Sequence, residues 1–421
     1  MSGIIVHEWI SKTGGSERVL DAMVETFPDA EIRCLWNDVP DSRYPGRTVR
    51  ESWLARTPLR RSKAVALPFM PFTWRHCKPG GYDWALVSSH LFAHHVSFTD
   101  QSDDFRKYVY VHSPARYIWD PEMDERGLGL LPRLVSPALR RLDRRRAQEA
   151  SSLAANSEYV RQRIQRAWDR DSQVIYPPVD VTHIQRVKSW ADELSDVERV
   201  AFDRLPVPFL LGASRFVPYK RLDVVIKAGE AAGLPVVLAG SGREELRLRE
   251  QAAQATVPVH FVSDPSDSLL YALYEAASVF VFPAIEDFGI MPVEAMATGT
   301  PVIGRRVGGV SETVIEGVTG SLIDDVDSPR SLAAAVTSAL VTASGACRSR
   351  ARAFDSANFS QTLQGWMGIK SVSYQVPGRH HIAPNHRSPS TFKDSGAYSS
   401  SGLTDPVELD LGEDAGGPSD T

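Results

Sequence analysis

The sequence predicts an α/β protein made of two doubly wound domains that face each other across a cleft. Short apolar runs typical of buried strands alternate with longer helical patterns in both halves of the chain, which indicates parallel sheets covered by helices. The length of 421 residues and the 43% hydrophobic content provide for two sizeable cores. Between the halves, the run Tyr176-Pro-Pro-Val-Asp180 interrupts the regular pattern and indicates the end of the first domain.

We expect five parts along the chain. These are a first domain over 1–182, a charged linker over 183–206, a second domain over 207–353, a C-terminal helix over 354–370 and a tail over 371–421. The tail is rich in Ser, Gly, Pro and Asp and lacks periodicity, which predicts disorder.

The composition argues against several classes of protein. No segment reaches the roughly 18 apolar residues that a transmembrane helix needs, and the start, MSGIIVHEWI, lacks the basic region of a signal peptide. Cys34, Cys77 and Cys347 are isolated, without metal-ligand spacing, and fit a reducing compartment. We therefore expect a cytoplasmic protein. The net charge of −5 gives no indication of nucleic-acid binding.

The stretch from Phe282 to Gly304 predicts a β–loop–α–β unit. The apolar run Ala277–Phe282 reads as a buried strand, Pro292 suits the first turn of a helix, and Gly299 ends that helix. The loop of such a unit follows the carboxyl end of a strand, where open α/β sheets bind their ligands.

Two carboxylates bracket this loop and the start of its helix. Glu286 lies in the loop, Glu294 about one turn into the helix, and Phe288-Gly289-Ile290 between them. Amides at a helix N-terminus favour a phosphate, whereas carboxylates accept hydrogen bonds from hydroxyl groups. A nucleotide diphosphate sugar offers both kinds of group in this order. The alternative is a capped helix with two solvated glutamates.

A pair of cations follows the first strand of the second domain. Arg215 comes directly after the predicted strand Phe209–Ser214, and Lys220 lies five residues later at the start of a helix. Two cations in these places can clamp a diphosphate, Arg through a planar fork and Lys as a point charge. The alternative is a pair of surface charges.

Two further strand ends in the first domain carry candidate residues. Gly14 and Gly15 follow the predicted strand Gly3–Val6 and allow a tight turn with close backbone approach. Spacing alone favours a plain turn, because the loop is neither a GxGxxG fingerprint nor a P-loop. His112 ends the strand Lys107–Val111 and precedes a Pro-containing loop, a place that faces a cleft. The alternative is a histidine satisfied by local hydrogen bonds.

Together these motifs resemble the retaining glycosyltransferase family 4, which has the GT-B fold of two Rossmann-like domains. Glu286-Asp-Phe-Gly-Ile-Met-Pro-Val-Glu294 resembles the family's Glu-x7-Glu signature, and Arg215 to Lys220 resembles its Arg-x4-Lys element. The run from Gly14 to Val19 resembles its first glycine loop. Tyr110-Val-His-Ser-Pro-Ala-Arg-Tyr-Ile-Trp-Asp120 resembles a branch that includes bacterial mannosyltransferases of polysaccharide assembly.

The resemblance covers about Gly3 to Met367 and implies roles for the candidate residues. It implies catalytic roles for His112 and Glu286 beside the donor sugar and for Arg215 and Lys220 on the leaving diphosphate. It implies donor binding by Gly14, Gly15, Phe288, Gly289, Ile290 and Glu294, the last through the ribose. The first domain would be the acceptor side, the second would bind the nucleotide sugar, and the last helix would cross back to the first domain.

The expected function is transfer of a sugar with retention at the anomeric carbon. We expect mannose from GDP-mannose and a glycan or lipid-linked glycan acceptor, with a UDP-sugar as the alternative donor. A nucleotide-sugar 2-epimerase and a non-catalytic sugar-nucleotide-binding protein are alternatives from other classes. We expect no cofactor. We also expect no catalytic metal, because Asp103-Asp104 and Asp324-Asp325 lack an accompanying ligand pattern.

Two basic segments raise the question of a membrane surface. A helix expected to begin at Ser136-Pro137 carries Arg140, Arg141, Arg144, Arg145 and Arg146. The segment Leu59–Trp74 combines basic residues with large apolar ones. One interpretation is attraction to anionic lipid or to a lipid-diphosphate acceptor at the inner face of the cell membrane. The alternatives are a solvated helix face and a segment packed on the core.

Overall fold

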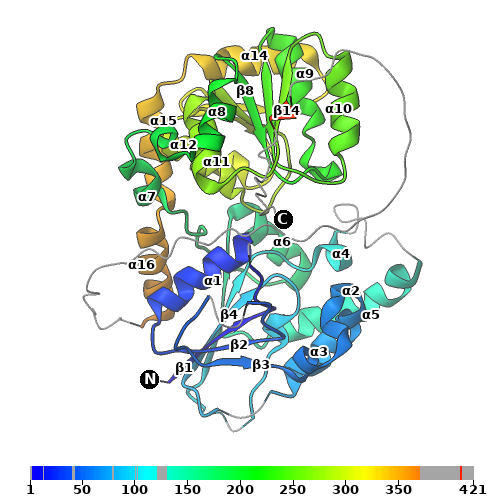
Figure 1. Ribbon diagram of the computed structural model, residues 1–421. Helices are drawn as coiled ribbons and strands as arrows, with labels where there is room; N and C mark the ends of the chain where they lie inside the picture. Colours follow the sequence, from blue (N-terminus) through cyan, green and yellow to red (C-terminus); the bar gives the residue numbers. More distant parts are fainter. Residues whose placement is uncertain are drawn as a thin grey trace, which may run out of the picture.

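The computed structural model describes residues 2–369, apart from 13, 40–42, 78, 79, 100, 102 and 121–129, together with residues 408 and 409. These residues form two α/β domains, one above the other in Figure 1. This confirms the predicted fold of two doubly wound domains. Apart from those last two residues, the tail expected to be disordered lies outside the described part of the chain.

The N-terminal domain is built on a parallel sheet of seven strands in the order β3-β2-β1-β4-β5-β6-β7. The strands are β1 (Gly3–His7), β2 (Glu31–Cys34), β3 (Val49–Glu51), β4 (Trp84–Ser89), β5 (Arg106–Val111), β6 (Ser152–Ala155) and β7 (Gln173–Val174). The helices are α1 (Gly15–Thr26), α2 (Lys63–Ala66), α3 (Met70–Arg75), α4 (Arg116–Trp119), α5 (Leu130–Ala147) and α6 (Glu158–Trp168).

Both faces of this sheet are buried, which explains its nearly continuous apolar strands. In β1, Ile4 and Val6 join a core that also contains residues of α3, α5 and α6. Ile5, on the opposite face, joins a core with α1. Because the strands are parallel, their carboxyl ends meet at one edge, where His7, Ser88, Ser89 and Val111 lie in register.

The C-terminal domain has six parallel strands in the order β13-β12-β11-β8-β9-β10, and the two-residue β14 (Glu408–Leu409) pairs beside β10. The strands are β8 (Leu210–Ala213), β9 (Val236–Ala239), β10 (Val259–Val262), β11 (Val279–Phe282), β12 (Val302–Arg305) and β13 (Gly320–Ile323). The helices are α9 (Asp223–Ala232), α10 (Glu245–Gln254), α11 (Asp267–Ala276), α12 (Ile290–Thr298), α13 (Val310–Thr313), α14 (Pro329–Leu340) and α15 (Ser344–Ala351).

The segment expected as a linker forms α7 (Val181–Arg186) and α8 (Asp196–Asp203), with a 3₁₀ turn between them. Ile184, Trp190 and Leu205 are buried in the core that also contains α11 and α12. This segment therefore packs on the C-terminal domain.

The chain crosses between the domains twice, and the two crossings lie together. The N–H group of Val179 donates to the carbonyl of Phe354, and the N–H group of Ser356 donates to the carbonyl of Val179, each at 3.0 Å. Beyond the second crossing, α16 (Ser356–Met367) packs on α1, with Phe359 and Leu363 buried in the N-terminal core. Figure 1 shows α16 beside α1.

The arginine-rich helix α5 begins earlier than the sequence analysis expected. It runs from Leu130 through Pro137, so Ser136-Pro137 is not its start. Pro132 occupies the first turn, where a missing N–H is tolerated. The predicted start was wrong because Pro137 lies inside the helix, a position where proline is normally disfavoured and that the sequence pattern therefore did not indicate.

Asp143, the acidic residue within the arginine run, is fully buried. Its Oδ2 accepts hydrogen bonds from the indoles of Trp119 and Trp168 at 2.8 and 2.7 Å, and its Oδ1 lies 3.0 Å from Nε2 of both His94 and His95. A buried carboxylate needs such donors to replace its hydration. Asp143 therefore fixes α5 to the core.

Candidate active site

All ten residues that the sequence analysis singled out line one cleft between the two domains. The cleft has a volume of about 1490 Å³. From the N-terminal domain it is lined by Gly14, Gly15 and His112, and from the C-terminal domain by Arg215, Lys220, Glu286, Phe288, Gly289, Ile290 and Glu294. These residues follow the carboxyl ends of four strands, β1, β5, β8 and β11, where parallel sheets form their ligand sites.

The loop from β11 to α12 forms the C-terminal wall of the cleft. Gly289 precedes the helix with φ of 89°, a conformation that only glycine adopts without strain. Pro292 lies in the first turn, and Gly299, at φ of 103°, ends the helix. The backbone therefore directs the first amides of α12 and the carboxylate of Glu286 into the same cleft.

Lys220 and Glu286 form an ion pair on this wall. Lys220 ends a 3₁₀ turn (Pro218–Lys220) after β8, and its side chain is only 10% exposed. Arg215, on the same loop, donates to the hydroxyl of Tyr219 at 3.2 Å. Two cations thus face the loop whose amides begin α12, and this set of donors suits a diphosphate.

The glycine pair brings the N-terminal domain close to α12. Gly15 begins α1, and a β-carbon added to it would lie 3.4 Å from Cδ1 of Ile290. One turn further along α1, Arg18 forms an ion pair with Glu294, whose side chain is 3% exposed. Glu294 raises the pKa of the Arg18 guanidinium, so this cation stays charged.

His112 is part of a hydrogen-bonded chain at the edge of the N-terminal sheet. Its Nε2 lies 2.8 Å from Oγ of Ser88, which lies 3.0 Å from Nδ1 of His7. Burial lowers the pKa of His112 to about 4 and that of His7, with the charge of His112 as a second cause, to about 3. Both imidazoles are therefore neutral at pH 7.

Several cleft residues were missed by sequence reasoning. Arg18 and Arg116 line the cleft, as does His90, whose ring is 6.1 Å from that of His112. Asp287 accepts hydrogen bonds from Arg116. Arg116 and Asp287 lie inside the motifs that the sequence analysis quoted, so their position in those motifs was the available signal.

One group of side chains among the described residues has a spacing that could accommodate a metal ion. It consists of His94, His95 and Asp143. All three are buried in the N-terminal core, outside the cleft, and Asp143 already accepts two indole N–H groups. In the described part of the chain, no helix is long and apolar enough to cross a membrane.

Comparison with known proteins identifies both domains. Residues 13–183 match the family model described as Glycosyltransferase Family 4, and residues 202–353 match the model described as Glycosyl transferases group 1. Together these two matches cover most of the chain.

Curated relatives match part of the chain. D-inositol 3-phosphate glycosyltransferase of Corynebacterium glutamicum is 32% identical over 45% of this chain and 49% of its own length. A GDP-mannose-dependent alpha-(1-6)-phosphatidylinositol monomannoside mannosyltransferase of Mycolicibacterium smegmatis is 29% identical over 48% of this chain and 55% of its own length. The chain thus spans about half the length of these two relatives.

Solved structures share the fold. Anabaena HepE in complex with UDP-glucose superposes with a TM-score of 0.63 at 20% identity, covering 87% of this chain and all of that one. Sucrose-phosphate synthase of Thermosynechococcus elongatus superposes with a TM-score of 0.65 at 20% identity, covering 87% of this chain and 98% of that one. Two parallel-sheet domains facing one cleft and two glycosyltransferase models along the sequence lead to one conclusion: the chain belongs to the family 4 glycosyltransferases of the GT-B fold.

Proposed function

We propose that this protein is a retaining glycosyltransferase that moves mannose from GDP-mannose to a glycan or lipid-linked glycan. The observation that carries the proposal is the convergence of Arg215, Lys220, Glu286 and Glu294 on one cleft, beside the first amides of α12. In this arrangement Glu294 binds the ribose hydroxyls, the cations and amides bind the diphosphate, and Glu286 binds the sugar.

The proposed reaction needs stabilisation of the leaving group rather than a strong base. The bond between the anomeric carbon and the phosphate oxygen breaks, and the acceptor oxygen bonds to the same carbon from the same face. The acceptor's proton passes to an oxygen of the departing diphosphate. Arg215, Lys220 and the amides of α12 neutralise the charge that develops on that diphosphate. These donors supply the required positive charge without a metal ion. His112, neutral at pH 7, hydrogen-bonds to the sugar.

Two observations bear on the donor. A relative matching 48% of this chain is named GDP-mannose-dependent, which supports mannosyl transfer. The structural neighbour from Anabaena was solved with UDP-glucose, so a UDP-sugar is the second candidate.

The decisive experiment titrates the protein with GDP and with UDP by calorimetry, in a metal-free buffer. GDP binding that is lost in Glu294→Ala and Lys220→Ala supports the donor site, and UDP preference replaces GDP-mannose by a UDP-sugar. Proton NMR of the product of GDP-mannose then reads the anomeric configuration. An inverted product, a 2-epimer formed without acceptor, or binding without turnover would each reject retaining transfer.

We also propose that the acceptor is presented at a membrane surface. Four large apolar side chains on the segment 53–72 are between 44% and 59% exposed and form what we call the apolar patch: Trp53, Val65, Phe69 and Phe72. Other residues of the same segment, Ala66 and Met70, are buried in the core. The exposed Arg56 and Arg61 lie in this segment and favour anionic lipid.

The segment that carries the apolar patch contacts the lining of the cleft through Lys63 and Trp9. Nζ of Lys63, on α2, lies 4.2 Å from the ring centre of Trp9, and Trp9 meets the ring of His90 edge-on at 4.8 Å. His90 lines the cleft. By contrast, Arg140 and Arg144 of α5 donate to carbonyls of the same domain at 2.7 and 2.8 Å. The apolar patch, more than the arginine run, therefore supports a lipid-linked acceptor.

A further inference from the structure

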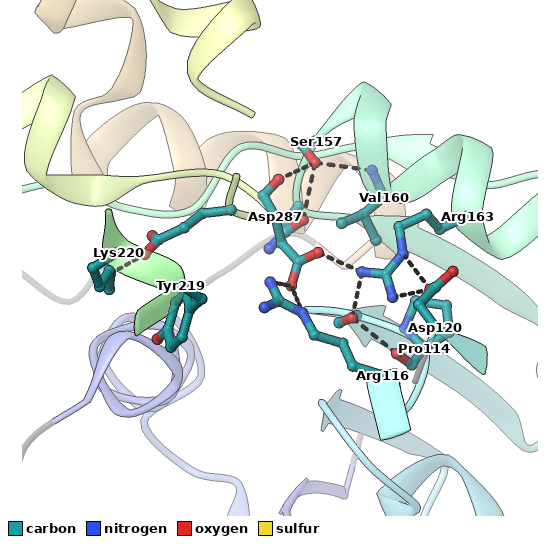
Figure 2. Close-up of polar contacts among 12 residues, drawn as sticks. Pro114, Arg116, Asp120, Ser157, Val160, Arg163, Tyr219, Lys220 and Asp287 are labelled. Carbon is teal, nitrogen blue, oxygen red and sulfur yellow. Dashed lines mark hydrogen bonds and ion pairs between the residues drawn. The ribbon is translucent and has the colours of Figure 1, made fainter. Parts of the chain in front are cut away.

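The loop that carries Glu286 is attached to the opposite domain through the next residue, Asp287. Its carboxylate accepts hydrogen bonds from Arg116 on α4 and from Arg163 on α6, each at 2.5 Å. Its backbone carbonyl accepts a further hydrogen bond from Oγ of Ser157 at 2.5 Å. Figure 2 shows the two guanidinium groups meeting at Asp287, with Lys220 on the other side. Both the side chain and the backbone of Asp287 are therefore bound across the cleft.

Arg163 connects Asp287 to a second carboxylate in its own domain. The Arg163 side chain is 2% exposed, and its Nε and Nη2 donate to Oδ2 of Asp120 at 3.0 and 2.5 Å. Its Nη1 donates to Asp287 and, at 2.8 Å, to Oγ of Ser113. Arg163 thus has Asp287 as a second carboxylate partner, besides Asp120 of its own domain. Asp287 can serve as that partner only while the two domains are in contact.

Glu312 makes a second contact between the C-terminal domain and α6. Its carboxylate accepts the backbone N–H groups of Glu158 and Tyr159 at 2.7 and 2.8 Å, at the positive end of the helix dipole. The N–H of Gly309, just before α13, donates to the carbonyl of Glu286 at 2.9 Å. The Glu286 loop is thus held between α13 of its own domain and α6 of the other.

We propose that Asp287 is a positioning residue that couples contact between the domains to the geometry of the donor site. The Glu286 side chain pairs with Lys220, whereas the adjacent Asp287 side chain pairs with the N-terminal domain. Fixing Asp287 therefore fixes Glu286 on one side and the first amides of α12, three residues on, on the other. A misplacement of about 1 Å in such a site can reduce turnover by about 100-fold. The coupling to turnover rests on the proposed transfer activity, whereas the bridge between the domains does not.

The test compares the full chain with Asp287→Asn, which keeps the shape of the side chain and removes its charge. Cys34, Cys77 and Cys347 are buried, so a cysteine introduced on the exposed face of each domain takes a dye selectively. Energy transfer between the dyes, without any donor, then reads the distance between the domains. We expect a longer mean distance in Asp287→Asn and, with donor and acceptor, a kcat reduced on the order of 10- to 100-fold. The affinity for the nucleoside diphosphate should change less than about 3-fold, because the Asp287 carboxylate is paired with Arg116 and Arg163 of the N-terminal domain.

The matched control is Arg161→Gln on α6, the helix that also carries Arg163. Arg161 pairs with Asp171 and Glu158 within its own domain, so this variant should leave distance and kcat unchanged. A second variant combines Arg116→Gln with Asp287→Asn. Its kcat should be no lower, and its distance between the domains no longer, than in Asp287→Asn alone, because the two side chains form one bridge.

Each outcome decides the proposal. A longer distance in Asp287→Asn supports the bridge even if the wild-type protein transfers no sugar, in which case only the proposed activity fails. An unchanged distance overturns the bridge. A reduced kcat at an unchanged distance, or loss of nucleotide affinity, would make Asp287 a donor contact and overturn its positioning role.

Discussion

Arg18 of α1 and Glu294 of α12 form an ion pair that joins the two domains across the cleft. The Glu294 side chain is 3% exposed, whereas the Arg18 side chain is 47% exposed. A buried carboxylate thus receives its counterion from the opposite domain. A ribose that binds Glu294 must share this carboxylate with Arg18 or replace Arg18 on it.

Glu294→Gln should therefore weaken binding of the nucleoside diphosphate. A hydrogen bond to a charged group contributes about 1.5–3 kcal/mol, so we expect a loss of roughly 10- to 150-fold in affinity. Calorimetric titration with GDP and UDP measures it. Glu250→Gln, an exposed glutamate on α10, is the control and should bind as the wild type does. Equal affinities of the two variants would remove Glu294 from the donor site.

Lys220→Gln should strongly reduce kcat and change the thermal unfolding temperature little. In the proposed reaction the Lys220 ammonium stabilises the charge that develops on the departing diphosphate. Loss of one such donor lowers kcat by about 100- to 1000-fold. Steady-state kinetics and thermal unfolding measure the two effects. Lys227→Gln on α9 is the control, because Lys227 is 39% exposed and pairs with Asp327. A kcat within a few-fold of the wild type would contradict the role of Lys220.

Three histidines with a lowered pKa, His112, His95 and His7, should make the protein less stable as the pH falls from about 6.5 to 4. The pKa is lowered to about 4 in His112 and His95 and to about 3 in His7, whereas in the unfolded chain it is about 6.5. Within this window these three histidines bind protons in the unfolded state but not in the folded state, so their contribution to the free energy of unfolding decreases with decreasing pH. Glu8, whose pKa burial raises to about 7, contributes in the opposite direction. Each pKa unit contributes about 1.4 kcal/mol.

Urea denaturation at pH 7.5, 6 and 5 measures this dependence. His112→Gln removes one of the three groups and should flatten the profile, whereas His183→Gln, on α7 of the other domain, should not. Turnover should show no inflection from His112 between pH 6 and 8. A rate that rises or falls through pH 6.5 and loses that inflection in His112→Gln would contradict a neutral His112.

Changes in the apolar patch should weaken binding to anionic vesicles. Phe69→Ser with Phe72→Ser removes two exposed rings, and their loss from the lipid interface should reduce the fraction that floats with the vesicles. Ile315→Ser with Val318→Ser, exposed apolar residues of the C-terminal domain, is the matched control. If both double variants float as the wild type does, the patch does not bind membranes.

The fold could be predicted because parallel strands buried on both faces are short apolar runs between breakers. The stretch that begins with β11 is an example. Its apolar residues Val279–Phe282 indicate a strand, the polar residues after them indicate a loop, and Pro292 and Gly299 indicate the start and end of a helix. The start of α5 could not be predicted in the same way. Ser136-Pro137 has the composition of a helix start, and the chain has a second proline, Pro132, that satisfies the same requirement one turn earlier.

The location of the candidate site could be predicted because its residues follow strand ends, which parallel sheets bring to one edge. The pairs Arg18 with Glu294 and Arg116 with Asp287 could not. The two partners of each pair are more than 150 positions apart in the sequence and meet only because the domains face each other. No local periodicity records that arrangement.

The return of α16 to the N-terminal domain has a consequence for the order in which the protein is made. Phe359, Leu363 and Met367 are buried with residues of α1 and β1, yet they leave the ribosome after the whole C-terminal domain. The first domain to be synthesised is therefore the last to be completed, and its surface beside α1 stays uncovered until then. Shortening the chain to Ala351 would leave this surface exposed permanently, so we expect such a truncation to aggregate during synthesis although it keeps the first sheet and strands β8 to β13 of the second.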